Sequence, residues 1–272
     1  MLLLTLTKLR FPVGYKHLFT QLQKCHSVFG IQNLIQQEKP DNFTVSTLTE
    51  EDHEMAIDVV KQYYLPQHAF VRARKMNLDN DRAFDQYLFE LFNQGSSLIA
   101  RSENESVAGV CINVANSLDH IRNLRHFAFY RQDPNIKDFL NFTAKMHEYP
   151  NLWDAYRQSE IFEINMLTVV PEFRRKYLAV LMTERSIAQA YERGFNVVRI
   201  NCINPHDYKI AERCMLQCIA MFPLHKLSNK RVSYITKNSE FDVLARVYVA
   251  ARVPLDDMGD EHKLSDLNLL HE

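Results

Sequence analysis

Glycine is scarce in this chain, and its scarcity limits the kinds of site that the sequence can build. Only six of the 272 residues are glycine, and none lies between Gly109 and Gly194. Walker loops, Rossmann dinucleotide loops and the G-x-S-x-G elbow of serine hydrolases all need glycines at short, fixed spacings. No such spacing occurs, so the sequence excludes nucleotide and hydrolase sites built on these motifs.

Cysteine and histidine are also too few and too irregularly spaced to form a recognisable metal site or disulfide framework. The five cysteines are Cys25, Cys111, Cys202, Cys214 and Cys218, an odd number without zinc-ligand spacing. The last two would share one face of a helix. No pair of histidines has the spacing of a zinc protease. We therefore expect no metal, and buried, reduced cysteines, as is typical of a reducing compartment such as the cytoplasm.

Long apolar runs and a strong charge of one sign are missing as well. The net charge is −1, which gives no general attraction to nucleic acid, and no segment is apolar for long enough to cross a bilayer. One aromatic and basic segment imitates a nucleic-acid surface, namely Arg122, Arg125, Phe127, Phe129, Tyr130 and Arg131. In a chain without excess charge we interpret it as a helix or loop that packs. We expect neither nucleic acid nor a membrane among the partners.

The composition is that of one globular domain with poorly packed ends. Hydrophobic residues make up 46% and charged residues 24% of the chain, and we find no linker, repeat or low-complexity tract. We assign the domain to residues 41–253. Residues 1–40 form an N-terminal extension, either a transit-like or poorly ordered segment or a variable arm. The polar tail, residues 254–272, is either disordered or a short docking helix.

Hydrophobic periodicity predicts the order of strands and helices. The predicted strands are 43–48, 97–101, 107–114, 161–170, 195–202, 232–236 and 243–253. Helices are expected from Thr49 to the turn at Pro66, and over 80–93, 136–147, 153–157, 178–193 and 208–218. This order predicts an α+β domain with a mixed, mostly antiparallel sheet flanked by helices.

The stretch from Glu163 to Gly194 carries the clearest functional signal, because a strand turns through a short loop directly into an amphipathic helix. Unpaired backbone N–H groups and the helix dipole at such a helix start attract a pyrophosphate. Arg174, Arg175 and Lys176 add positive charge beside it. On these residues alone two interpretations are equally supported, a phosphate-binding element and a basic loop that keeps a turn soluble.

The same stretch resembles the coenzyme A signature of the GNAT superfamily of N-acetyltransferases. The residues that match its V-x-P-x-[YF]-R and R/Q-x-x-G-x-G/A pattern are Val169, Pro171, Phe173, Arg174 and Ala179. Over 43–253 the chain is most similar in pattern to the insect and nematode arylalkylamine N-acetyltransferases, with QHAFVRA in place of their D-E-P-L-x-R-A-like segment. The resemblance implies the GNAT fold. It also implies an acyltransferase that moves an acetyl group from acetyl-CoA directly to a primary amine, with arylalkylamines as a candidate class.

The resemblance further implies which residues hold the coenzyme. Backbone groups of Leu167, Thr168 and Val169 would bind the pantetheine arm and the thioester oxygen. The pyrophosphate would lie against Arg174, Arg175, Lys176, Tyr177, Leu178 and Ala179. The chain departs from the family at Tyr177, where a glycine is expected so that the backbone can approach the phosphates. Tyr177 either points away from the phosphates or obstructs them.

Three side chains are candidates for proton transfer in the implied reaction. His68 matches the family's acidic base, and histidine titrates near neutrality; the alternative is a loop histidine without a catalytic role. Glu163 faces the presumed cleft as a second candidate base, unless a register shift of one residue turns it to solvent. Tyr208 is the candidate acid that protonates the leaving sulfur, or else an aromatic side chain that packs against the core.

Departures from the family at His68, Tyr177 and Lys209 keep a second function open. In the first, the chain is an N-acetyltransferase that acts on a small-molecule amine as a monomer or weak dimer. In the second, it is a GNAT-fold protein that has lost catalysis and serves as a coenzyme A binder or interaction module. A mechanism carried largely by the backbone tolerates changes of side chain, so the sequence favours the enzyme.

Overall fold

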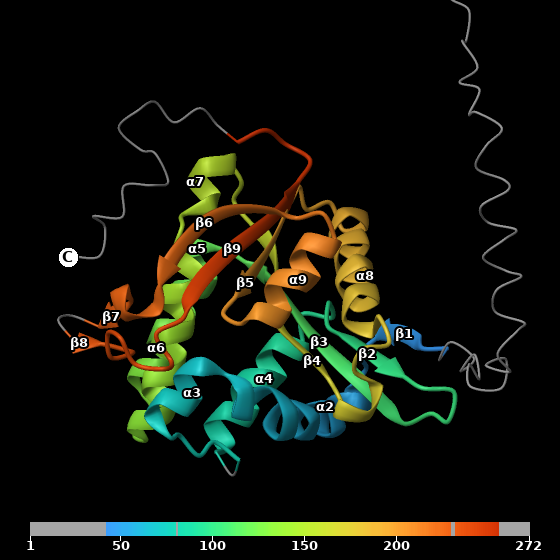
Figure 1. Ribbon diagram of the computed structural model, residues 1–272, viewed down its shortest axis with the longest axis horizontal. Helices are drawn as coiled ribbons and strands as arrows, with labels where there is room; N and C mark the ends of the chain where they lie inside the picture. The colour runs from blue at the N-terminus through green and yellow to red at the C-terminus, as the bar shows by residue number, and fades with distance from the viewer. Residues whose placement is uncertain (1–41, 80, 230–231, 256–272) are drawn as a thin grey trace, which may run out of the picture. The chain divides into compact units, whose positions relative to one another are not determined.

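The computed structural model describes residues 42–79, 81–229 and 232–255 (Figure 1). The N-terminal extension that the sequence predicts over 1–40 lies outside these residues, as does the tail after residue 255. The domain limits of 41–253 therefore stay a prediction. Within the described ranges, no helix combines the length and the apolar composition that crossing a bilayer requires.

A seven-stranded sheet forms the centre of the fold, in the order β1-β2-β3-β4-β5-β9-β6. Its strands are β1 (Thr44–Thr47), β2 (Leu98–Arg101), β3 (Val107–Asn116), β4 (Ile161–Val169), β5 (Val197–Cys202), β6 (Gln217–Pro223) and β9 (Leu244–Ala251). All neighbouring pairs are antiparallel except β4 and β5, which run parallel. A separate ribbon pairs β7 (Ser228–Asn229) with β8 (Val232–Ser233). The predicted α+β class with a mixed, mostly antiparallel sheet is confirmed.

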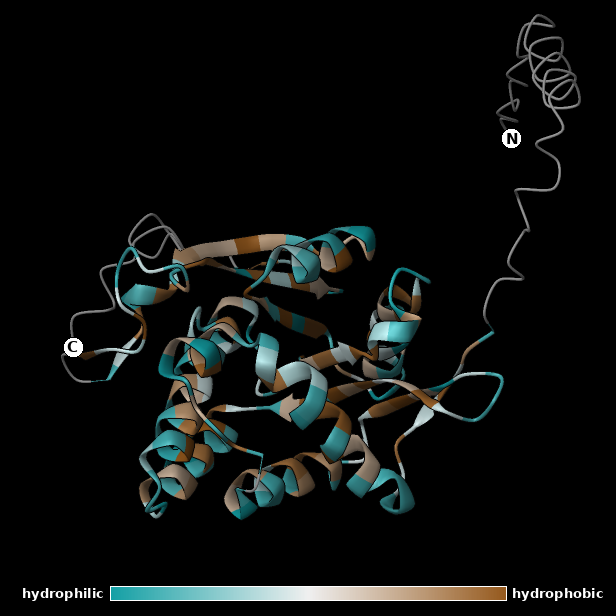
Figure 2. Cartoon of the chain, turned by 60° about the horizontal axis from the view of Figure 1, so that its bottom comes forward, coloured by the Kyte–Doolittle hydropathy of each residue, from teal (hydrophilic) through white to brown (hydrophobic). Residues whose placement is uncertain are grey.

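Helices cover both faces of the sheet and enclose two apolar cores. The first face carries η2 (Glu50–Asp52), α2 (His53–Val59), η3 (Val60–Tyr64), η4 (Leu65–Gln67), α3 (Ala69–Arg74), α4 (Arg82–Phe92), α5 (Leu118–Phe129), α6 (Pro134–Glu148) and α7 (Leu152–Tyr156). The second face carries α8 (Leu178–Glu192) and α9 (Pro205–Arg213), which lie side by side (Figure 1). Short helices η5 (Pro171–Phe173) and η6 (Leu224–Lys226) lie in connections. Much of the sheet is brown in Figure 2, as expected for strands that are buried on both faces.

Side-chain caps fix where most of the longer helices begin. In α4, α5, α6, α7 and α9, a side-chain oxygen of the residue just before the helix accepts hydrogen bonds from backbone N–H groups of the first turn. The capping residues are Asp81, Ser117, Asp133, Asn151 and Asn204. Such caps satisfy N–H groups that have no partner inside the helix. Helix α8 differs, because its N-cap residue Tyr177 makes no side-chain cap hydrogen bond.

The structure corrects the sequence prediction after α9. The helix expected to reach Cys218 ends at Arg213, because Met215 takes a left-handed φ of 60° that a helix cannot continue through. The chain then forms the edge strand β6. Cys214 and Cys218 therefore share no helix face, and Cys218 is exposed instead of buried.

Gly109 determines how closely α8 packs on the sheet. A Cβ atom at this position would lie 2.9 Å from the backbone oxygen of Thr168 and 3.2 Å from Sδ of Met182 in α8. The Thr168 oxygen belongs to β4, which is paired with β3 at this point, so it cannot move aside without disturbing the sheet. Only glycine leaves room for the Thr168 oxygen at this point, whereas the Met182 side chain of α8 can shift.

We expect Gly109→Ala to lower the free energy of unfolding by about 1–3 kcal/mol, the usual result of overpacking a core. Chemical denaturation measures the change. Thr47→Ala, on the exposed side of β1, is the control and should change the free energy by less than about 1 kcal/mol. An unaltered stability of Gly109→Ala would mean that the backbone of β4 can shift to accommodate a Cβ atom at this position.

Candidate functional site

Strands β4 and β5 separate partway along their length and leave an open fork in the sheet. They pair only between residues 162–164 and 198–200. Beyond that point β4 keeps its bonds to β3, but among the described strands it has no partner on the β5 side. The register with β3 shifts between Ile112 and Asn113, so Asn165 forms a bulge at the fork. Backbone N–H and C=O groups along this edge are available to bind a ligand.

The start of α8 follows soon after this unpaired edge of β4. The first hydrogen bond of the helix runs from the Leu181 N–H to the Tyr177 carbonyl oxygen. The N–H groups of Leu178, Ala179 and Val180 therefore precede the helical hydrogen-bond ladder. A helix of 15 residues without a side-chain cap presents both these donors and its dipole to an anion.

The predicted basic residues lie on the exposed loop before α8. Arg174 donates from Nε to the Val169 carbonyl oxygen over 3.0 Å, which holds its guanidinium at the end of β4. Lys176 Nζ lies 5.7 Å from the centroid of the Phe173 ring, a cation–π distance. Arg175 has a φ of 63°, so the chain turns sharply there. The loop thus brings positive charge to the start of α8.

Tyr177 stands where the resemblance expects glycine, and its backbone has the conformation that glycine favours. Its φ is 67°, a left-handed value that costs a residue with a Cβ about 1–2 kcal/mol. The side chain is 57% exposed, and its hydroxyl donates to Glu184 Oε1 over 3.2 Å. Glu184 is about two turns further along α8, so the tyrosine side chain extends along the outside of the helix.

Glu163 is fully buried, with none of its surface exposed. Asn116 Nδ2 donates to its Oε2 atom over 2.5 Å, and Asn201 Nδ2 donates to its Oε1 atom over 2.6 Å. Arg199 Nε lies 3.8 Å from the same Oε1 atom. The carboxylate therefore lies in the protein interior, among polar partners from β3 and β5, and does not face solvent.

Arg199 is equally buried and connects β5 to the end of α6. Its guanidinium donates to the carbonyl oxygens of Met146, His147 and Tyr149, the last over 2.6 Å. A cation at a helix C-terminus satisfies carbonyl groups that have no partner in the helix. Burial lowers the pKa of this guanidinium, while the nearby Glu163 carboxylate raises it. The ion pair with Glu163 thus holds β4, β5 and α6 together beside the fork.

A chain of polar side chains runs from this ion pair to the bulge of β4. His147 Nε2 lies 3.7 Å from Glu163 Oε1 and 3.2 Å from Asn165 Oδ1. Asn165 in turn donates from Nδ2 to the Tyr87 hydroxyl over 3.4 Å. The Asn165 side chain at the fork is therefore oriented from within the core. Among the described residues, no group of three His, Cys, Asp or Glu side chains is arranged to hold a metal ion.

His68 lies between η4 and α3, in an aromatic cluster. Its ring centroid is 5.6 Å from those of Tyr64 and Phe139 and 5.8 Å from that of Phe142. Burial lowers the pKa of His68 to about 4, so the imidazole is neutral at pH 7 and accepts a proton only weakly. Its Nδ1 atom is buried without a hydrogen-bond partner.

Tyr208 lies on α9 and packs toward β9. Its hydroxyl donates to the Leu244 carbonyl oxygen, and the Arg246 guanidinium carbon lies 4.2 Å from its ring centroid. Burial raises the pKa of the hydroxyl. In this arrangement the proton of Tyr208 is directed at the backbone of β9.

Asp207 is a candidate that the sequence analysis missed. It precedes Tyr208 on α9 and is half-buried, and burial raises the pKa of its carboxyl to about 7. Carboxyl groups with such pKa values are found at functional sites more often than elsewhere. The sequence offers one hint, the Asn204–Asp207 spacing of a helix cap, but that spacing does not reveal burial.

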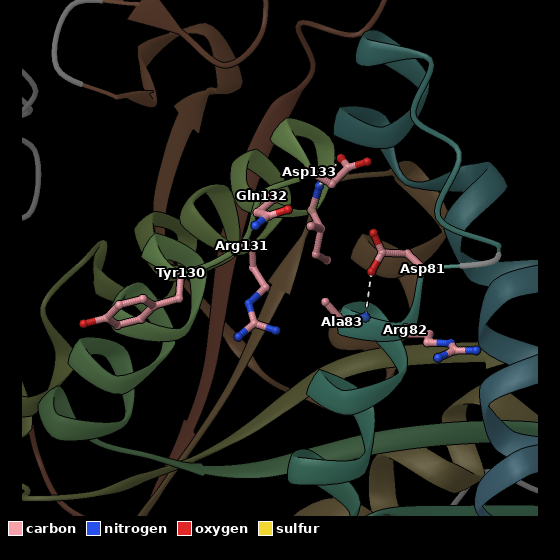
Figure 3. A pocket seen from close by; sticks show the side chains of 8 residues that line it. Asp81, Arg82, Ala83, Tyr130, Arg131, Gln132 and Asp133 are labelled. Carbon is pink, nitrogen blue, oxygen red and sulfur yellow. Dashed lines mark hydrogen bonds between the residues drawn. The ribbon is translucent and has the colours of Figure 1, made fainter.

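A shallow hollow lies between the start of α4 and the connection from α5 to α6. Its volume is about 430 Å³, and Figure 3 shows Arg131, Gln132 and Asp133 facing Asp81 and Arg82 across it. The Asp81 side chain, which caps α4, lines one side of the hollow. None of the lining residues belongs to β4, β5, α8 or α9, so the hollow is separate from the fork.

We expect Arg199→Leu to lower the free energy of unfolding by about 3–5 kcal/mol, since it leaves the Glu163 carboxylate buried without its cation. Thermal or chemical denaturation measures the loss. The matched control is Arg122→Leu, which breaks an exposed ion pair with Asp119 and should cost less than about 1 kcal/mol. Equal losses in the two variants would contradict the importance given to the buried pair.

No protein-family model matches the chain, and no curated protein matches it either. Solved structures do match. Mosquito arylalkylamine N-acetyltransferase like 5b superposes with a TM-score of 0.70 at 13% identity, over 77% of this chain and 100% of that chain. Arylalkylamine N-acetyltransferase 2 from Aedes aegypti gives 0.67 at 18% identity, over 77% and 99%. Drosophila melanogaster polyamine N-acetyltransferase, which catalyses formation of N-acetylagmatine, gives 0.69 at 11% identity, over 77% and 100%.

These superpositions extend over nearly the whole of each matched enzyme and over the described domain of this chain. They agree with the seven-stranded mixed sheet flanked by helices. The fold that the resemblance implied is therefore confirmed. The chain has the fold of the insect arylalkylamine and polyamine N-acetyltransferases, the GNAT fold.

Proposed function

We propose that the chain is an N-acetyltransferase that moves an acetyl group from acetyl-CoA to a small primary amine in a ternary complex. The observation that carries this proposal is the unpaired edge of β4 next to the uncapped start of α8. The first can bind an extended amide chain, and the second can bind a pyrophosphate. Enzymes with the same fold acetylate arylalkylamines and polyamines, which supports the proposal.

The residues present fit a coenzyme A group in two respects. Leu167, Thr168 and Val169 lie on the free edge of β4, where their backbone groups would pair with the amides of the pantetheine arm. The N–H groups of Leu178 and Ala179 would bind the pyrophosphate oxygens. The basic loop of Arg174, Arg175 and Lys176, together with Tyr177, would surround it and favour its negative charge.

We place the acceptor amine on the opposite side of the fork, beside η3. This short π-helical turn packs against β4 and carries the partly buried Tyr63 and Tyr64. Single π-turns are frequent at functional sites, and aromatic faces attract both aromatic rings and cations. Phe70 and Phe84 are fully buried and contribute to the core. The arrangement suits an arylalkylamine as the acceptor.

Proton transfer has three candidate residues carried over from the sequence. Tyr208, on the helix that follows β5, is the candidate acid for the leaving sulfur, although its hydroxyl would first have to leave the Leu244 carbonyl. His68 and Glu163 stay candidates for the base. Both are buried, and both oxygens of Glu163 already accept amide hydrogen bonds. The contacts of Glu163 favour a role in orienting Asn116 and Asn201 beside the fork.

A second function stays open, that of a coenzyme A binder or interaction module without catalysis. The observation that favours it is the left-handed tyrosine at position 177, since a Cβ and a ring occupy the place of a glycine. Lys209 is a further departure from the family pattern. In either case we expect a monomer or weak dimer in the cytoplasm.

Calorimetry with acetyl-CoA, followed by an assay of thiol release, tests both functions. The enzyme should bind acetyl-CoA and release thiol with at least one of tyramine, dopamine, serotonin or a polyamine. Binding without turnover on any amine would support the second function. No binding at a coenzyme concentration near 1 mM, the upper end of ordinary KM values, would contradict both.

Substitutions of Tyr177 separate the effect of its ring from that of its backbone. We expect Tyr177→Gly to keep or increase affinity for acetyl-CoA, because glycine adopts the positive φ without strain and exposes the loop backbone. Tyr177→Ala also removes the ring but retains the strain, so its stability should be lower than that of Tyr177→Gly by about 1 kcal/mol. Calorimetry and thermal denaturation measure the two effects. A large loss of affinity in both variants would mean that the ring itself contacts the coenzyme.

A further inference from the structure

The fork between β4 and β5 begins at an asparagine in each strand. Ile164 and Ile200 are the last residues that face each other across the parallel pair. Asn165 follows on β4, and Asn201 follows on β5. Paired strands lie about 4.8 Å apart, so the two asparagines are close to each other where the strands begin to separate. Both are half-buried, which leaves part of each side chain accessible to a ligand in the fork.

Both asparagine side chains lie on the face of the sheet that carries η3. Asn165 contacts His147 of α6 and Tyr87 of α4, and these two helices belong to that face. Asn201 comes two residues after Arg199, whose guanidinium bonds to the end of α6. Side chains two residues apart in a strand share a face. The acceptor site proposed beside η3 is therefore on the same side of the sheet as the two asparagines.

The chemistry of its neighbours fixes which way the Asn201 amide points. Arg199 Nε donates to Asn201 Oδ1 over 3.0 Å, and Asn201 Nδ2 donates to Glu163 Oε1 over 2.6 Å. A guanidinium can only donate a hydrogen bond, and an ionised carboxylate can only accept one. A flipped amide would lose both bonds, so the oxygen of Asn201 faces Arg199.

The Asn165 amide is fixed in a similar way through His147. Nε2 of this histidine lies 3.7 Å from Glu163 Oε1 and 3.2 Å from Asn165 Oδ1. Because the carboxylate is an acceptor, Nε2 carries the ring hydrogen, and Asn165 turns its oxygen toward it. Burial lowers the pKa of His147, which favours the neutral ring. Asn165 Nδ2 donates to the Tyr87 hydroxyl over 3.4 Å, so both ends of the amide have a partner.

Each of the two amide oxygens still has room for one more donor. An amide oxygen can accept two hydrogen bonds. From side chains in the described part of the protein, Asn165 Oδ1 accepts the one from His147, and Asn201 Oδ1 accepts the one from Arg199. The fork therefore begins between two oriented acceptors, each with a free lone pair.

We propose that Asn165 and Asn201 bind the acceptor nitrogen from the two sides of the fork and thereby select primary amines. The inference rests on the proposed function and names contacts that determine the specificity of that site. Once an alkylammonium has given one proton to a base, its nitrogen carries two N–H groups and a lone pair. One N–H would donate to each asparagine oxygen, which leaves the lone pair directed at the acyl carbon beside β4. A secondary amine has a single N–H and would satisfy only one asparagine.

The alternative is that the asparagines only support the buried ion pair, and Asn116 shows what that role looks like. Asn116 Nδ2 donates to Glu163 Oε2 over 2.5 Å. Its side chain is fully buried, and it pairs with Ile161 at the end of β4 away from the fork. Asn165 and Asn201 make comparable contacts but keep accessible surface at the fork, which a purely supporting residue does not need.

Kinetics with tyramine and N-methyltyramine tests the inference. We expect the native kcat/KM to be about 10-fold or more higher for the primary amine, the usual effect of one hydrogen bond to a charged or reacting group. Asn165→Leu and Asn201→Leu each remove one acceptor, so the value for tyramine should fall about 10-fold while that for N-methyltyramine stays nearly unchanged. The preference for the primary amine is then lost, with unchanged affinity for acetyl-CoA. Asn165→Asp retains an acceptor oxygen and should keep the preference.

Asn196→Leu is the matched control. Asn196 is a half-buried asparagine directly before β5, at the end away from the fork, and donates to Gln158 Oε1 over 3.0 Å. This variant should keep the native preference. Asn165→Ala repeats the test if a leucine variant does not fold. Equal native rates for the two amines, or a native preference in the Asn165 and Asn201 variants, would overturn the inference and leave the proposed function intact. If the native protein acetylates no amine, the proposed function fails and the inference fails with it.

Discussion

The ion pair between Arg199 and Glu163 determines where the sheet can open. Arg199 satisfies the last carbonyl groups of α6, and Glu163 accepts amide hydrogen bonds from both neighbouring strands. Two charges this deep in a protein are tolerated only when nearly every hydrogen-bonding position is filled. The pair therefore fixes the positions of β4, β5 and α6 relative to one another beside the fork. Immediately beyond it the two strands are free to diverge, and the site occupies the gap.

The fork has a second consequence, which concerns how the two layers of helices cooperate. In a closed sheet, helices on opposite faces influence each other only through the strands between them. Here η3 packs against β4 from one face, and α9 packs against β5 from the other. A binding site at this point can include residues from the helices on both faces of the sheet.

Local sequence patterns predict the strands and helices that have a regular hydrophobic periodicity. They do not predict environments that depend on contacts with residues distant in the sequence. The strand of Glu163 and the helix of α8 follow from their own periodicity. The environment of Glu163 does not, because Arg199 and His147 reach it from separate elements of the sequence. Strand β6 is not predicted, because the sequence around Met215 fits a short polar helix as well as it fits an edge strand. Asp207 is not predicted, because its spacing from Asn204 indicates a helix cap and does not show that the carboxyl is partly buried.

The close approach at Gly109 affects the thermodynamics of ligand binding at the start of α8. Met182, one turn into α8, lies against β3 at Gly109, and this contact fixes the helix on the sheet close to its start. An anion that binds there meets donors that are already oriented, and little conformational entropy remains to be lost. Binding at α8 should therefore be largely enthalpic, with only a small heat-capacity change from the protein.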